Sequence, residues 1–68
     1  MKLFRDFLEE YIGERITIDF RYGVGKAEIG KILEVHVDFV KWQSLDGIFL
    51  YIPIDNIATI GRYISGTD

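Results

Sequence analysis

One segment of the sequence matches the first part of a phosphate-binding loop. Residues 25–31 read Gly-Lys-Ala-Glu-Ile-Gly-Lys, which fits G-x-x-x-x-G-K, a pattern in which backbone amides and the lysine hold nucleotide phosphates. The next residue is Ile32, where a Ser or Thr would coordinate magnesium. The following residues also predict a strand, whereas such a site needs the N-terminus of a helix. We interpret the match as chance and expect no cofactor.

Side chains that commonly perform acid–base or metal chemistry are few. His36 is the only histidine and there is no cysteine, so a metal would lack its usual nitrogen and sulfur ligands. For nucleophilic catalysis a lone histidine would have to activate a serine or cysteine, and the sequence offers no recognisable nucleophile. Glu28, Glu34 and Asp38 could pair as carboxylates, but their alternation on a strand is more typical of a solvated face. We expect neither an enzyme nor a metal site.

Aromatic residues make up 15% of the chain, a high share for its length. One use of such rings is stacking on single-stranded bases. Packing in cores and interfaces is more common, and we assign most of the rings to it. Phe39 is the one aromatic residue that we assign to ligand contact. For His36 we expect a solvent-facing or subunit-contact position, with a base-binding pocket as the alternative.

The charge balance is acidic. Eleven acids against eight bases give a net charge of -3, opposite to the basic balance of many nucleic-acid binders. Lysines and arginines are scattered among acids, which is typical of a mixed surface. This balance counts against non-specific affinity for RNA or DNA, although a local basic patch on an assembly remains compatible with it.

Length and composition indicate one domain, residues 1–68, that needs help to be stable. A chain of 68 residues forms a marginal core. Without cysteine it has no disulfides, so oligomerisation is the remaining source of stability. The missing cysteines also fit a reducing cytoplasm. No run approaches the roughly 20 apolar residues of a membrane helix, and the acidic residues near Met1 argue against a signal peptide.

The N-terminal residues predict a helix over about residues 2–12. Apolar residues recur there at spacings of three and four, namely Leu3, Phe4, Phe7, Leu8, Tyr11 and Ile12. Gly13 stands where a left-handed cap would end the helix. We expect Leu3, Phe7, Leu8 and Tyr11 to cover the strands that follow.

Five strands are predicted between residues 14 and 64. Period-two alternation predicts the first at 15–22, and the others are expected at 27–37, 39–43, 48–52 and 57–64. Gly30 indicates a bulge or bend in the second, and Asp46-Gly47 predicts a hairpin between the third and fourth. The residues 65–68 read as a frayed tail. The fold class is therefore mainly β, with a helix before a strongly bent, five-stranded antiparallel small barrel.

The fourth predicted strand, Ile48-Phe49-Leu50-Tyr51-Ile52, has no polar face. A strand of a lone small barrel should alternate, because one side meets water. An apolar run bounded by turns is typical of a strand that is buried on both faces. The chain is too short to cover both faces itself, so this strand predicts self-assembly.

The order of these motifs resembles the Sm-like (LSm) family, whose bacterial branch is typified by Hfq. In that family a short helix precedes a bent five-stranded barrel with a glycine in strand two and an Asp near the start of strand three. Gly30, Ile32 and Asp38-Phe39-Val40 stand in those places, and residues 55–60 look like the turn into an Ile-x-x-Ile strand. The gap from Gly30 to Asp38 is longer than usual, and Ile54-Asp55 stands where Hfq has a Lys-His pair.

This resemblance implies a homo-oligomeric ring, a hexamer or heptamer, that binds single-stranded RNA. The RNA site would include His36, Asp38, Phe39, Asp55 and Asn56. Family rings pair strand four with strand five of a neighbour, which implies an interface of Ile48, Phe49, Leu50, Tyr51, Ile52, Ile57, Thr59 and Ile60. The alternative is a protein-interaction or scaffolding ring without a nucleic-acid role.

Overall fold

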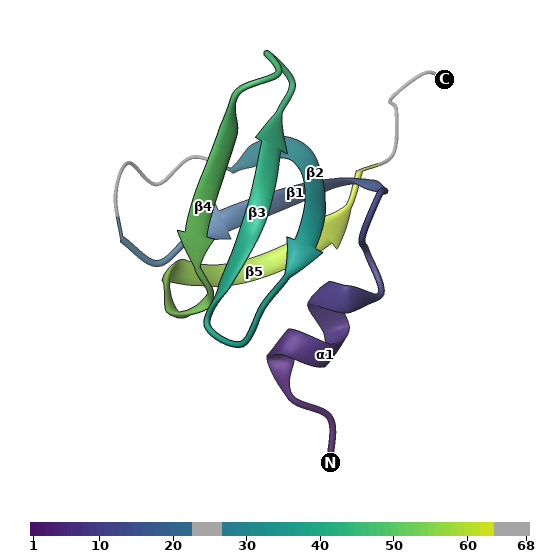
Figure 1. The fold of residues 1–68 in the computed structure, drawn as a ribbon, viewed down its shortest axis with the longest axis vertical. Coiled ribbons are helices and arrows are strands. Elements are labelled where there is room, and N and C mark those ends of the chain that lie inside the picture. Colours follow the sequence, from purple (N-terminus) through teal and green to yellow (C-terminus); the bar gives the residue numbers. More distant parts are fainter. Residues whose placement is uncertain (23–26, 64–68) are drawn as a thin grey trace.

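The computed structural model describes residues 1–22 and 27–63 as one short helix followed by a single antiparallel sheet (Figure 1). Its elements are α1 Phe4–Glu9, β1 Arg15–Phe20, β2 Glu28–Val35, β3 Phe39–Ser44, β4 Phe49–Pro53, the 3-10 helix η1 Ile54–Asn56, and β5 Ile57–Arg62. The strand order is β4-β3-β2-β1-β5. The predicted helix and five strands are thus confirmed.

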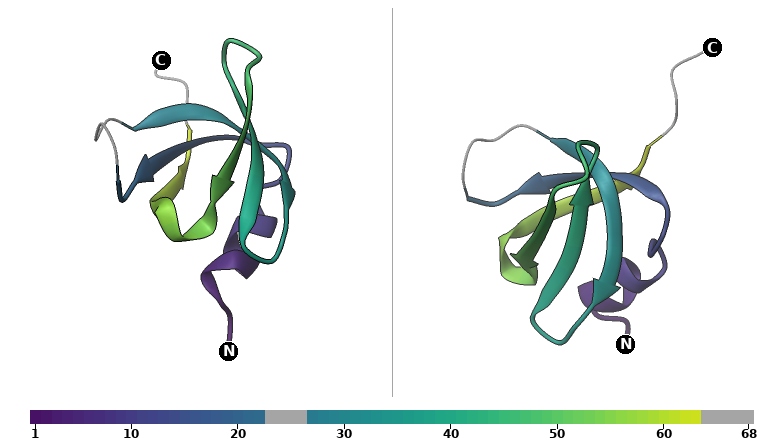
Figure 2. Two further views of the ribbon diagram at one scale, coloured as in Figure 1. Left: turned by 60° about the vertical axis from the view of Figure 1, so that its left-hand side comes forward. Right: turned by 45° about the horizontal axis from the view of Figure 1, so that its top comes forward.

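The sheet is strongly curved but its hydrogen-bonded ladder stays open. In Figure 1 and in the right view of Figure 2 the sheet bends so that β1 and β5 cross behind β3 and β4. Each strand pairs with its neighbour in the order, and β4 and β5 are the two edges. Within one chain, therefore, the sheet does not close into the expected barrel.

Helix α1 and strands β1, β2 and β5 are shorter than the sequence predicts. Helix α1 begins at Phe4 and ends at Glu9, and turn bonds then carry the chain to Gly13, whose φ of +85° fits the predicted left-handed residue. Strand β1 ends at Phe20, β2 ends at Val35, and β4 begins one residue late, at Phe49. The predicted turn at 23–26, residue Ile64 and the tail 65–68 lie outside the described residues. No described helix has both the length and the apolar character that crossing a membrane requires.

The core lies inside the bend of the sheet, and Trp42 is its largest side chain. The buried residues are Leu8, Ile16, Ile18, Ile32, Val40, Trp42, Ile52 and Ile57. Trp42 packs so closely over Gly30 that a Cβ there would lie 2.5 Å from Cζ2 of the indole. The predicted bulge occurs just after this contact, because the β2–β3 register shifts between Ile32 and Glu34.

Helix α1 covers the core through fewer residues than expected. Leu8 is fully buried and Tyr11 packs against the core, whereas Leu3 and Phe7 are exposed. The expectation that Leu3 and Phe7 cover the sheet is therefore wrong for the single chain. Phe4, Phe7 and Tyr11 instead border a hollow of about 370 Å³ beside residues 58–60 of β5.

Strand β4 exposes most of its apolar side chains in the single chain. Ile52 is 5% exposed, but Phe49, Leu50 and Tyr51 are 53%, 44% and 66% exposed. The strand pairs on one side only, with β3. The predicted burial on both faces is thus not achieved within one chain, and β4 is an apolar edge.

Candidate functional site

The turn between β2 and β3 brings the rings of His36, Phe39 and Tyr51 into contact. The N–H of His36 donates to the carbonyl oxygen of Phe39 at 2.8 Å, which closes the turn. The two rings stack, with centroids 4.4 Å apart and an interplanar angle of 14°. The ring of Tyr51 on β4 meets Phe39 edge-on at 5.8 Å.

Glu34 holds the imidazole of His36 in this position. Its Oε1 lies 2.8 Å from Nε2 of His36. This hydrogen bond lowers the pKa of the Glu34 carboxyl, helped by the charges of Lys41 and His36 and opposed by desolvation. The carboxylate form therefore predominates near neutral pH, and the pair fixes the ring orientation from the solvent side.

The second predicted segment lies next to this turn. The N–H of Ile54, the first residue of η1, donates to the carbonyl oxygen of Asp38 at 2.9 Å. Asp38 and Asp55 are both exposed. The structure thus brings His36, Asp38 and Phe39 together and places Asp55 immediately after the residue that joins η1 to them.

Asn56 has a different set of contacts. Its side-chain Oδ1 accepts the N–H of Tyr22 at 2.8 Å, and its backbone oxygen accepts the N–H of Arg21 at 2.7 Å. Both bonds hold the segment after β1 against the start of β5. The side-chain carbonyl of Asn56 therefore has a structural role.

Sequence reasoning missed that Tyr51, Phe49 and Lys41 extend the same surface. The β3–β4 register sets Lys41 opposite Tyr51, and the Lys41 ammonium lies 5.2 Å from the centroid of the Phe49 ring. We call His36, Phe39, Tyr51, Phe49 and Lys41 the aromatic strip. Alternation along β3, combined with the register that the Asp46-Gly47 hairpin sets, could have identified it.

The predicted interface residues fall into three groups. Ile52 and Ile57 lie in the core, so as interface residues they could contribute backbone groups but not side chains. Phe49, Leu50, Tyr51 and Ile48 are exposed at one edge. At the other edge the Thr59 hydroxyl donates to Asp19 at 3.0 Å, and Ile60 is half-buried beside the hollow at α1.

Within the described residues no cluster of three or more His, Cys, Asp or Glu side chains could hold a metal ion. Comparisons of the chain with protein-family models, with curated proteins and with solved structures returned no match. Arguments about function therefore start from the geometry of the edges and of the aromatic strip.

Proposed function

We propose that the protein is an Sm-like, ring-forming homo-oligomer that binds single-stranded RNA. The observation that carries this proposal is the open strand order, which leaves β4 and β5 unpaired at opposite edges. An exposed apolar edge strand invites pairing with another chain. In the proposed assembly each β4 pairs with β5 of the next subunit.

The two edges differ, so this contact is head-to-tail. Such heterologous contacts form a closed ring when the rotation between subunits closes. Strand β4 offers exposed Phe49, Leu50 and Tyr51, and the β5 edge has the apolar hollow bordered by Phe4 and Phe7. Covering these side chains would supply the burial that a chain of this size lacks.

The aromatic strip supports the RNA part of the proposal. Single-stranded RNA is recognised largely by stacking unpaired bases on aromatic side chains, at about 1–3 kcal/mol per base. Phe39 is held between His36 and Tyr51 at the turn, so its ring is oriented before any ligand arrives. Lys41 adds one cation beside Phe49.

The acidic groups around the turn favour a second candidate, a protein-interaction or scaffolding ring. Glu34 is ionised, Asp38 and Asp55 are exposed on either side of the Asp38–Ile54 bond, and the chain carries a net charge of -3. These charges repel phosphates. If RNA binds, stacking must carry a larger share of the affinity, and the salt dependence should be shallow.

Light scattering in solution tests the assembly. The wild type should be a multiple of the monomer mass at micromolar concentration. Leu50→Lys should give smaller or insoluble species, because it places a charge in the apolar edge. Leu45→Lys is the matched control, since Leu45 is more exposed and lies in the β3–β4 turn. A soluble wild-type monomer would contradict the ring.

A fluorescence titration with labelled oligo-U and oligo-A, at two salt concentrations, tests RNA binding. Phe39→Ala should weaken binding by about fivefold to 150-fold for each stacked base lost. Phe39→Tyr, which keeps the ring, should bind nearly as well as the wild type. Absence of wild-type binding at low salt and tens of micromolar protein would retire the RNA proposal and favour the scaffolding ring.

A further inference from the structure

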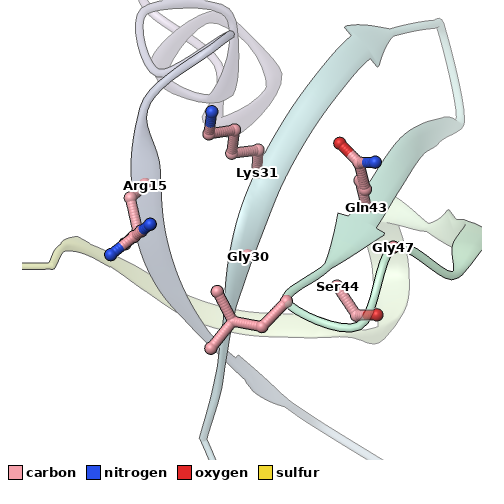
Figure 3. A pocket seen from close by; sticks show the side chains of 7 residues that line it. Arg15, Gly30, Lys31, Gln43, Ser44 and Gly47 are labelled. Atoms are coloured by element: carbon pink, nitrogen blue, oxygen red, sulfur yellow. The ribbon is translucent and has the colours of Figure 1, made fainter.

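A second surface feature lies where β1, β2 and β3 run side by side. A hollow of about 210 Å³ is lined by Arg15, Gly30, Lys31, Gln43 and Ser44, together with Leu45 and Gly47 of the β3–β4 turn (Figure 3). Figure 3 shows the polar side chains rising from three different strands around the backbone of Gly30. None of the residues named above as the aromatic strip lines it.

The polar side chains that line this hollow are hydrogen-bond donors. Arg15 and Lys31 contribute a guanidinium and an ammonium, and Gln43 contributes an amide. The Oγ of Ser44 accepts the N–H of Ile48 at 3.2 Å, which leaves its hydroxyl hydrogen free to donate. Among the described residues no carboxylate lines the hollow.

Neither Arg15 nor Lys31 forms an ion pair with any other described residue. Arg15 stands directly opposite Lys31 in the β1–β2 register, and like charges at opposing positions are destabilising. The ion pairs in residues 1–22 and 27–63 join Lys2 to Glu10, His36 to Glu34 and Arg62 to Glu14. In Figure 3 the head groups of Arg15 and Lys31 extend in different directions.

We propose that this hollow binds a phosphate group. The group belongs to free phosphate or a phosphomonoester in one form of the proposal, and to a phosphodiester of RNA in the other. An anion in the hollow would draw the Arg15 and Lys31 head groups toward it and replace their repulsion with two charge-assisted contacts, and a guanidinium can bind two phosphate oxygens at once. Gln43 and Ser44 would donate to the remaining oxygens. The free-phosphate form is independent of the proposed function, whereas the RNA form rests on it.

Isothermal titration calorimetry of the full chain with inorganic phosphate and with uridine 5′-monophosphate, at constant ionic strength, tests the site. The wild type should bind saturably. Lys31→Gln and Arg15→Gln should each weaken binding by about tenfold, the effect of losing one charge-assisted contact. Arg21→Gln, an exposed cation outside both the hollow and the aromatic strip, is the matched control and should bind like the wild type.

Melting temperatures, measured without and with phosphate, give a second readout. Because the two charges repel, Lys31→Gln should melt at the same or a higher temperature than the wild type in phosphate-free buffer, and phosphate should raise its melting temperature less. Two results would overturn the proposal. One is the absence of saturable wild-type binding at tens of millimolar phosphate, and the other is equal affinity across Arg15→Gln, Lys31→Gln and Arg21→Gln.

The oligo-U titration distinguishes the two sources of phosphate. If the site holds RNA, Lys31→Gln should weaken oligo-U binding and reduce the salt slope by about 0.7, the value for one phosphate contact on a single strand. If the site holds a free phosphate or monoester, the same variant should lose phosphate binding and bind oligo-U unchanged. Phe39→Ala should keep phosphate binding in either case, so failure of the RNA proposal is separable from failure of this site.

Discussion

The ring of His36 stacks on the ring of Phe39 at the β2–β3 turn. The two stacked rings form a platform. The turn bond from the His36 N–H to the Phe39 oxygen and the Glu34 carboxylate on the imidazole fix this platform from two sides. A ring already held in place costs less ordering when a ligand binds. The stacked pair is therefore suited to contact a flat group such as a base.

The bond between Glu34 and His36 predicts a pH dependence of stability. The bond lowers the pKa of Glu34 below its usual value of 4.5, so the folded state binds fewer protons than the unfolded state in this window. The stabilisation is present above pH 4.5 and is lost as the pH falls through the lower folded pKa. The effect should be small, because both side chains are exposed.

Melting temperatures measured from neutral to acid pH check this expectation. Glu34→Gln should lie slightly below the wild type at neutral pH, and the difference should shrink toward zero as the carboxyl becomes protonated. Glu9→Gln is the control, because Glu9 is an exposed glutamate of α1. A gap between Glu34→Gln and the wild type that stays constant across the whole range would contradict the assignment.

The close contact between Gly30 and Trp42 predicts that Gly30 tolerates no side chain. A Cβ at Gly30 would lie 2.5 Å from both the backbone oxygen of Gln43 and Cζ2 of the indole. Gly30→Ala should therefore destabilise the fold by about 3 kcal/mol or more, as overpacking of a core does. Gly61→Ala is the matched control, since its Cβ would meet the Thr17 hydroxyl at an ordinary 3.5 Å. Urea unfolding curves of the two variants give the comparison, and equal stabilities would contradict it.

Helix α1 predicts a contrast between two leucines. Leu8 is fully buried whereas Leu3 is 53% exposed. Leu8→Ala should lower the free energy of unfolding by about 2–5 kcal/mol, the range for buried leucines, and Leu3→Ala should change it by much less. Chemical unfolding measures both. Similar losses at the two positions would mean that an assembly buries Leu3, which the masses of the two variants in solution would reveal.

The sequence predicts the element order well because each element has a local signal. Leucine and phenylalanine spacing indicates α1, alternation indicates β1, and Asp46-Gly47 indicates the β3–β4 hairpin, where Gly47 has the expected positive φ of 85°. The helix bounds are less accurate because the residues after Glu9 continue in turns, which keep the same apolar spacing for a few residues.

Relationships between distant segments are the part that the sequence does not specify. The apolar pattern of β4 indicates burial on both faces, but the strand order places β4 at an edge, where Phe49, Leu50 and Tyr51 are exposed in the single chain. The match to a phosphate-binding loop is a second case in which the sequence does not specify a relationship between distant segments. Lys31 lies in β2, with no helix after it, yet Arg15 comes to lie opposite through the β1–β2 register. No local pattern contains that register.

Asn56 gives a prediction that separates a structural role from a ligand-binding one. Its Oδ1 accepts the N–H of Tyr22 and its backbone oxygen accepts that of Arg21, so the side chain anchors the end of β1. Asn56→Ala should lower the free energy of unfolding by about 1 kcal/mol, the usual net value of one hydrogen bond. Asn56→Asp keeps an acceptor oxygen and should lose less. If Asn56 instead used its amide on base edges, Asn56→Asp would unfold like the wild type in urea but bind oligo-U and oligo-A clearly more weakly.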